Sequence, residues 1–203
     1  SDFFEDVNNE IPEESEEENM RNYVQIDGVY ILKQRADLED YVVERYCKEE
    51  TSLEEFFAKY DEFLQEYELD DEKLQLTPSV RASRSNRLCE SNKLLWKQNQ
   101  RLRYYDVQSG DYSELLETLN LGQYANVELS TRKFLQDYPD VMARYDLRDE
   151  YEVHNLLKKI HAESENSDLI FSRMPNIIFG TFDRDAAVKE LLFALAPISQ
   201  DDL

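Results

Sequence analysis

Apolar positions in the first half of the chain recur mostly at helical spacing, and this spacing predicts two successive helices. Over residues 36–48, an apolar stripe marks one face of the first helix. The second helix begins at Ser52, where Glu55, three residues later, completes a capping box for the free N–H groups of the helix start. Its large apolar residues recur three or four positions apart and predict one buried face: Phe56, Phe57, Tyr60, Phe63 and Leu64.

Short apolar runs around polar tips predict β-hairpins. Residues 23–32 hold two such runs on either side of Asp27 and Gly28, which favours a hairpin or the edge of a small sheet. Arg81, Arg84 and Arg87 stand three residues apart and predict a third helix, with Val80, Leu88 and Cys89 on its opposite side. Apolar runs on either side of the polar residues 98–100 follow and predict a second hairpin. Three helices followed by a hairpin, over residues 36–107, is the order of a winged helix.

The same order begins again near residue 112. The pattern predicts a helix over 112–119 with Gly122 at its C-cap, a strand over 127–129, helices over 130–142 and 148–161, and a hairpin over 169–180. The helix at 130 aligns without a gap with the helix at 52: Ser130, Phe134, Tyr138 and Met142 stand at the positions of Ser52, Phe56, Tyr60 and Leu64. This spacing indicates a repeat of roughly 70 to 75 residues.

We therefore predict a mainly α (α+β) fold of tandem winged helix-turn-helix domains, each with three helices and a β-hairpin wing. The first domain spans residues 21–107 and the second 108–183. Residues 184–203 resemble the start of a truncated third unit, which predicts that the chain is a fragment of a longer protein. Residues 1–20 hold nine acids and no base, as in a flexible tail or linker. An acidic mimic that competes with nucleic acid is the alternative for this tail.

The composition fits a folded, soluble protein. Aromatic residues make up 12% of the chain, more than a disordered sequence carries. No apolar run approaches the roughly 18 residues that cross a bilayer, and no signal-peptide pattern opens the sequence, so we expect a cytoplasmic protein without membrane association. Cys47 and Cys89 lack metal-ligand spacing and are expected to be reduced core residues.

Charge is segregated along the chain. The net charge is -22, yet the segment from Lys73 to Arg103 holds eight basic residues and one acid, Glu90. Such segregation is typical of a surface that binds polyanions. Salt bridges to the acidic remainder of the chain are the alternative interpretation. The candidate nucleic-acid-binding residues are Arg81, Arg84, Arg87, Lys93, Lys97, Arg101 and Arg103.

Catalysis has little support in the sequence. Nucleophile-elbow, phosphate-loop and zinc-protease motifs are absent. His154 and His161 could share one face of a helix, but without a third ligand we interpret them as core or surface histidines. We expect no enzyme activity, no cofactor, no metal and no small-molecule substrate. The helix over 148–161 has mixed charge, which suits a protein partner better than DNA.

Two segments carry a family resemblance. DLRDEYEVHNLLKKI (146–160), followed by LIFSRMPNIIFG (169–180), resembles the winged-helix modules typified by the N-terminal domain of the bacterial RNA polymerase delta subunit and the related HARE-type helix-turn-helix domains. SRSNRLCESNKLLWKQNQRLRYYD (83–106) looks like the recognition helix and wing of a similar module. The resemblance implies a role beside transcription or DNA and no enzyme activity.

Two functions follow as expectations. In the first, the chain is a module of a larger bacterial transcription-associated or regulatory protein whose first domain binds double-stranded DNA, while the second mediates protein contacts. In the alternative, both domains dock on a protein such as RNA polymerase, without direct DNA contact. Charge segregation favours the first function. The pI near 4.4 favours the second, because an acidic protein repels DNA at long range.

Overall fold

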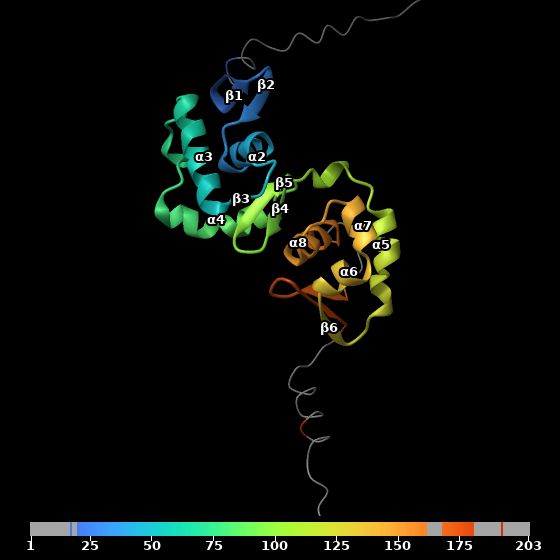
Figure 1. Cartoon of the computed structure of the whole chain (residues 1–203). Coiled ribbons are helices and arrows are strands. Elements are labelled where there is room, and N and C mark those ends of the chain that lie inside the picture. The colour runs from blue at the N-terminus through green and yellow to red at the C-terminus, as the bar shows by residue number, and fades with distance from the viewer. Residues whose placement is uncertain (1–16, 18–19, 162–167, 181–191, 193–203) are drawn as a thin grey trace, which may run out of the picture. The chain divides into compact units, whose positions relative to one another are not determined.

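The computed structural model describes residue 17, residues 20–161, residues 168–180 and residue 192 (Figure 1). The described residues form two compact units. The first reaches residue 95 and includes residues 99–106, and the second consists of residues 96–98 and the described residues from 107 on. The predicted acidic tail and the predicted third unit lie outside the described residues, except for positions 17, 20 and 192. Within the described ranges, no helix is long and apolar enough to cross a membrane.

The first unit combines three helices with two small sheets. In chain order its elements are β1 (Tyr23–Ile26), β2 (Val29–Leu32), α2 (Arg35–Tyr46), β3 (Thr51–Ser52), α3 (Leu53–Glu66), the 3₁₀ turn η1 (Glu72–Leu74), α4 (Pro78–Glu90), the first half of β4 (Leu94–Lys97) and β5 (Arg101–Tyr104). β1 and β2 pair as a separate hairpin, and β5 lies between β3 and β4 in the second sheet. The hairpins expected over 23–32 and near 93–106 are therefore present.

Turn and cap residues place these elements where the sequence indicates. Asp27 (φ 49°) and Gly28 (φ 81°) both have positive φ, as the tight turn between β1 and β2 requires. Ser52 Oγ accepts the N–H of Glu55 at 3.2 Å, and Glu55 Oε2 accepts the N–H of Ser52 at 3.0 Å. The predicted capping box is thus confirmed. Pro78 opens α4, at a position where its missing N–H costs nothing.

The core of the first unit lies among the three helices and the sheet. Its fully buried side chains include Leu38, Val42, Phe56, Tyr60, Phe63, Leu88, Leu94 and Leu102. The one polar atom that Tyr60 brings into this core is satisfied, because its hydroxyl donates to Leu74 O at 2.7 Å. Burial raises the pKa of that hydroxyl. Packing of aromatic rings therefore holds α3 against the rest of the unit, as the periodicity of its sequence predicts.

From its first helix on, the second unit follows the order of helices and strands that the first unit has from α2 on, except that two short helices stand in the place of α3. Beyond residues 96–98 its elements are the 3₁₀ turn η2 (Val107–Ser109), α5 (Ser113–Leu119), the 3₁₀ turn η3 (Leu121–Gln123), β6 (Val127–Ser130), α6 (Arg132–Asp137), α7 (Pro139–Arg144), α8 (Glu150–His161), β7 (Leu169–Phe171) and β8 (Asn176–Phe179). β8 lies between β6 and β7 and pairs with each in antiparallel register. In both units, the strand after the first helix pairs with the last strand of the hairpin.

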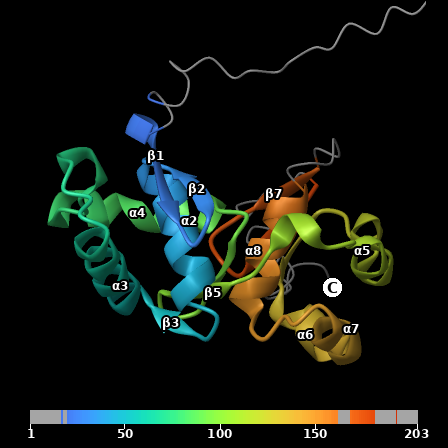
Figure 2. The same ribbon diagram turned by 90° about the horizontal axis from the view of Figure 1, so that it is seen from above.

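Two local predictions for the second unit are wrong. The helix expected over 130–142 is interrupted between α6 and α7 (Figure 2). Pro139 has no N–H to donate to the preceding turn, so the helix cannot continue through it. Thr131 rather than Ser130 occupies the N-cap of α6. Likewise, Asn120, at φ 45°, is the C-cap of α5 in place of the predicted Gly122.

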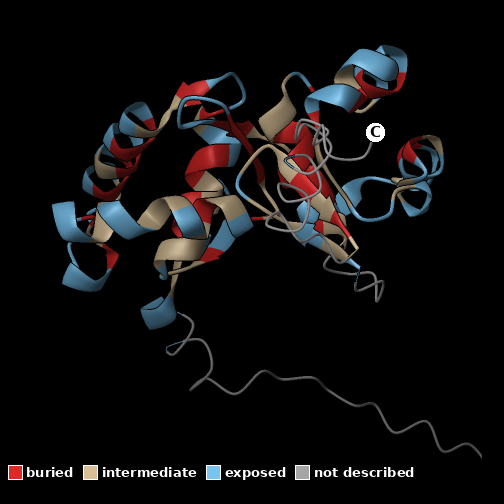
Figure 3. Cartoon of the chain, turned by 90° about the horizontal axis from the view of Figure 1, so that it is seen from below, coloured by how far each residue is buried: buried red, intermediate tan, exposed pale blue. Residues whose placement is uncertain are grey.

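The core of the second unit draws on α5, α6, α7, α8 and the sheet. Its buried apolar side chains include Leu115, Leu119, Phe134, Met142, Val153, Leu156, Ile177 and Phe179. α8 is buried on more than one face, since Glu152, His154, Asn155 and Lys159 are buried as well (Figure 3). α8 therefore buries polar side chains, and each of them requires a hydrogen-bond or ion-pair partner in the interior.

Candidate nucleic-acid interface

The three arginines of α4 are ion-paired with carboxylates of the same unit. Arg81 pairs with Asp61 of α3. Arg84 pairs with Glu39 of α2, through both its Nε, at 3.2 Å from Oε2, and its NH2 group. The Nη2 atom of Arg87 lies 3.5 Å from Asp40 Oδ1, also on α2. The sequence leaves two interpretations of these arginines, a surface for polyanions and salt bridges to acidic residues of the same chain. In the structure, all three form salt bridges.

The Arg84–Glu39 pair is the most buried of these contacts. The Glu39 side chain is 0% exposed and that of Arg84 is 15% exposed. Burial raises the pKa of the Glu39 carboxyl, although the hydrogen bond and charge of Arg84 oppose the shift. Removal of Arg84 would leave the buried Glu39 carboxylate without its cation. This arginine therefore stabilises the packing of α4 against α2.

Further contacts fix the other two arginines. The Nε of Arg81 donates to Leu76 O at 2.8 Å, and its guanidinium carbon lies 5.1 Å from the centre of the Phe57 ring. Asp40, the partner of Arg87, also accepts from Ser91 Oγ at 2.7 Å. A guanidinium that stacks on a ring and bonds a backbone oxygen has fewer donors left for a phosphate.

The basic residues near β4 and β5 differ in exposure. Lys93 Nζ lies 3.7 Å from Asp106 Oδ1, and Arg101 Nη1 lies 3.3 Å from Glu50 Oε1. These two side chains are 35% and 47% exposed. Arg103 is 2% exposed, with its guanidinium carbon 5.4 Å from the centre of the Tyr105 ring. Arg103 is therefore part of the interior.

Lys97 belongs to the second unit, together with Trp96 and Gln98. Its Nζ lies 2.7 Å from Glu152 Oε1 and 3.1 Å from Asp149 Oδ2, and its side chain is 4% exposed. Trp96 N donates to Asn155 Oδ1 at 2.9 Å. These contacts satisfy polar groups that α8 buries and leave Lys97 no exposed charge.

The acidic partners are the residues that sequence reasoning did not identify. Arg81, Arg84, Arg87, Lys93, Lys97 and Arg101 each have a carboxylate partner within 4.0 Å. The partners, in that order, are Asp61, Glu39, Asp40, Asp106, Asp149 with Glu152, and Glu50. One sequence signal for such pairing exists in α2. Glu39 stands directly after Leu38 and three residues before Val42, on the buried stripe of that helix. An acid at a core position requires a cation from another element.

The histidines and cysteines are not part of a metal-binding cluster in the described part of the chain. His154 is buried, and its Nε2 lies 3.0 Å from Asn176 O. The centres of the His154 and Phe171 rings are 5.4 Å apart in a T-shaped arrangement. Burial lowers the pKa of His154 to about 4. Cys47 and Cys89 are not disulfide-bonded, and burial raises the pKa of Cys47 to about 11. Among the described residues, no group of three or more potential ligands could hold a metal.

No protein-family model, curated protein or solved structure matches this chain.

Proposed function

We propose that both units are winged-helix modules and that the chain acts through protein contacts, without direct contact to DNA. The order helix, strand, helix, helix and hairpin, with the first strand beside the last, supports the winged-helix assignment in each unit. In the second unit, the corresponding second helix is divided into α6 and α7. The resemblance of residues 146–180 to the delta-subunit module agrees with this assignment.

The pairing of the α4 arginines is the observation that carries the proposal. A recognition helix reads DNA with side chains that are free to enter the groove. Arg84 could reach a phosphate only by leaving Glu39 buried and unpaired, and the loss of one partner from a buried pair typically costs about 3 to 5 kcal/mol. A phosphate contact at the surface does not offset such a cost.

The net charge also favours a protein partner over DNA. At -22 the chain repels a polyanion at long range, and the ion pairs of α4 neutralise the basic helix locally. An acidic chain with neutralised arginines is suited to a partner protein that has basic or apolar surface. RNA polymerase is the first partner to test, because the family resemblance points to it.

Double-stranded DNA remains the second candidate on one specific observation. Arg81, Lys93 and Arg101 keep side-chain exposures of 35%, 35% and 47%. Exposed ion pairs contribute little stability, typically below about 1 kcal/mol, so such pairs can exchange a carboxylate for a phosphate. DNA binding through these residues would not need Arg84.

Fluorescence anisotropy of a labelled mixed-sequence duplex separates the two functions. We expect no binding at about 50 mM salt, the condition that most favours phosphate contacts. Purified RNA polymerase should bind the labelled chain saturably in the same assay. Duplex binding that weakens steeply with salt and is lost in Arg101→Glu would instead establish DNA as the ligand.

A further inference from the structure

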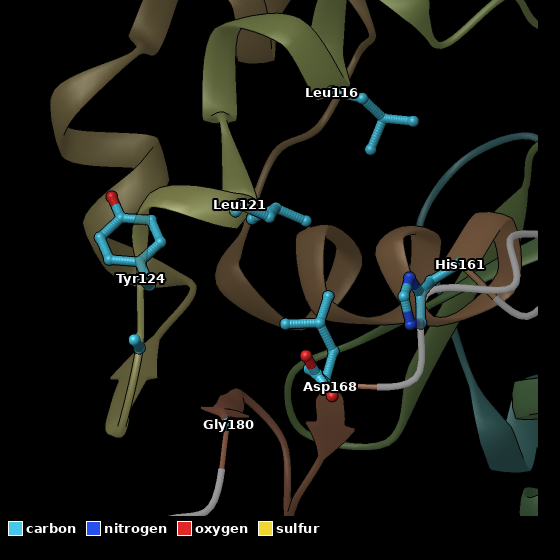
Figure 4. A pocket seen from close by; sticks show the side chains of 9 residues that line it. Leu116, Leu121, Tyr124, His161, Asp168 and Gly180 are labelled. Atoms are coloured by element: carbon cyan, nitrogen blue, oxygen red, sulfur yellow. The ribbon is translucent and has the colours of Figure 1, made fainter.

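Two hollows of the second unit share Leu116 of α5. The first has a volume of about 380 Å³, with Leu121, Tyr124 and Leu169 in its walls. The second, also of about 380 Å³, is lined by Val107, Tyr112 and Ile160. In Figure 4, Leu116 and Leu121 approach the first hollow from one side, and His161 and Asp168 lie on the other. We call the two hollows with Leu116 between them the α5 groove.

Leu116 is placed to contact a second molecule. Its neighbour Leu115 is fully buried and Leu119 completes the inward face of α5, whereas Leu116 is 41% exposed. Each hollow lies within the range of about 300 to 1,000 Å³ that is usual for ligand pockets. The α5 groove thus has the size to accept side chains of about the size of leucine, and its walls combine apolar residues with polar ones such as Gln108, Ser113 and Asp168.

Carboxylates outnumber basic side chains around the α5 groove. Asp168 lines the first hollow, and Glu117 and Asp111 adjoin lining residues in the sequence. Lys159, which adjoins Ile160, is buried. Two hydrogen bonds from Ser113 lower the pKa of Asp111, so it remains ionised at neutral pH. Within the part of the chain that the structure describes, none of these three carboxylates has an ion pair. Glu114 on the same helix differs, because it pairs with Arg144.

We propose that the α5 groove binds an amphipathic segment of a partner protein, with apolar side chains in the two hollows and lysines or arginines beside Asp168, Glu117 and Asp111. This inference rests on the proposed function, since it specifies the surface through which the chain contacts a protein. A helix with apolar residues at positions i, i+3, i+4 and i+7 satisfies both requirements, because its polar face can carry the basic residues. The carboxylates of Asp168, Glu117 and Asp111 attract a basic segment and repel an acidic one.

A fluorescein-labelled helical peptide of about 14 leucines and lysines, apolar along one face, is the probe for anisotropy with the full chain. Its counterpart has glutamate in place of every lysine. We expect binding of the lysine peptide alone. Leu116→Ser should weaken it at least tenfold, while Val29→Ser, at a residue 57% exposed in the first unit, should leave it unchanged. Asp168→Asn should weaken it about threefold, a charge effect of under 1 kcal/mol.

Adsorption of a basic peptide anywhere on an acidic protein is the competing outcome, and it overturns the proposal if Leu116→Ser and Val29→Ser bind equally well. Backbone amide chemical-shift changes, measured by NMR as the peptide is added to the wild-type chain, give a second measurement that does not depend on the variants. Shifts should concentrate at Leu116, Leu121 and Leu169, and their absence there refutes the α5 groove. Such a failure leaves the protein-contact proposal standing if the duplex still does not bind. Duplex binding by the wild-type chain overturns that proposal, whatever the peptide does.

Discussion

The third helices of the two units hold the same place in the order of elements but are attached by different interactions. α4 buries a single residue, Leu88, and meets α2 and α3 through the ion pairs of its arginines. α8 buries residues on several faces, with Val153, Leu156 and Leu157 in the core. A row of arginines can therefore replace an apolar stripe as the attachment of a helix. Basic residues at regular helical spacing do not by themselves indicate a surface for DNA.

The second helices differ at one aligned position. Phe56 and Phe134 are both fully buried, so the alignment of the two helices holds at that position. Where the first unit has Asp61, the partner of Arg81, the second has Pro139, which begins α7. The second unit thus lacks an acid at this place and also loses the continuous helix. One position changes both the shape of the second helix and the means of attaching the third.

The attachment of α4 through ion pairs predicts a large loss of stability when the buried pair loses one partner. Arg84→Met should destabilise the first unit by about 3 to 5 kcal/mol, because it leaves the buried Glu39 carboxylate without its cation. Urea unfolding followed by hydrogen exchange in α2 and α4 measures the loss in that unit.

Two control variants separate the loss of the buried ion pair from other effects of the substitution. Adding Glu39→Met to Arg84→Met should restore most of the stability, because a buried ion pair can be replaced by apolar residues of similar volume. Arg101→Ala removes the exposed pair with Glu50 and should cost less than about 1 kcal/mol. If Arg84→Met costs no more than Arg101→Ala, ion pairs do not attach α4, and the contrast with α8 fails.

The sequence predicts the elements of the two units better than it predicts their contacts. Helical periodicity and the capping box at Ser52 locate α3, and Asp27 with Gly28 locates the first hairpin, because these signals are local. Pro139 is a local signal for the break between α6 and α7, because proline has no N–H to donate to the preceding turn, and the prediction of one helix over 130–142 does not take it into account. The acids that pair with Arg84 and Arg87 stand 45 and 47 residues away. Spacing along one helix contains no information about a partner on another.

The buried His154 predicts that acid destabilises the second unit. The pKa of His154 in the folded second unit lies near 4, below its ordinary value of 6.5, because burial disfavours the charged ring. Between these pH values the unfolded chain takes up a proton that the folded unit does not. The His154 contribution to the free energy of unfolding should therefore fall as the pH drops from 6.5 to 4, by up to about 1.4 kcal/mol per pH unit.

Hydrogen-exchange protection of α8 and α2 between pH 7 and pH 4 measures this difference between the units. Glu39 of α2 has a raised pKa, so its proton uptake in the folded state acts in the opposite direction. His154→Gln should remove the part of the pH dependence that is specific to α8. An α8 that loses protection with acid to the same extent in His154→Gln would show that other groups govern the acid response.

The smallest effect tests the alignment of the second helices at their first residues. Ser52→Ala should cost about 1 kcal/mol, because it removes the oxygen that accepts the N–H of Glu55 at the N-cap of α3. Ser130→Ala should cost less, since Ser130 precedes the N-cap residue Thr131 and forms no capping box: its Oγ accepts the N–H of Arg132 at 3.3 Å. Matched urea titrations of the two variants give both values. Equal costs would mean that Ser130 caps its helix as Ser52 does, and that the two second helices begin alike despite the break at Pro139.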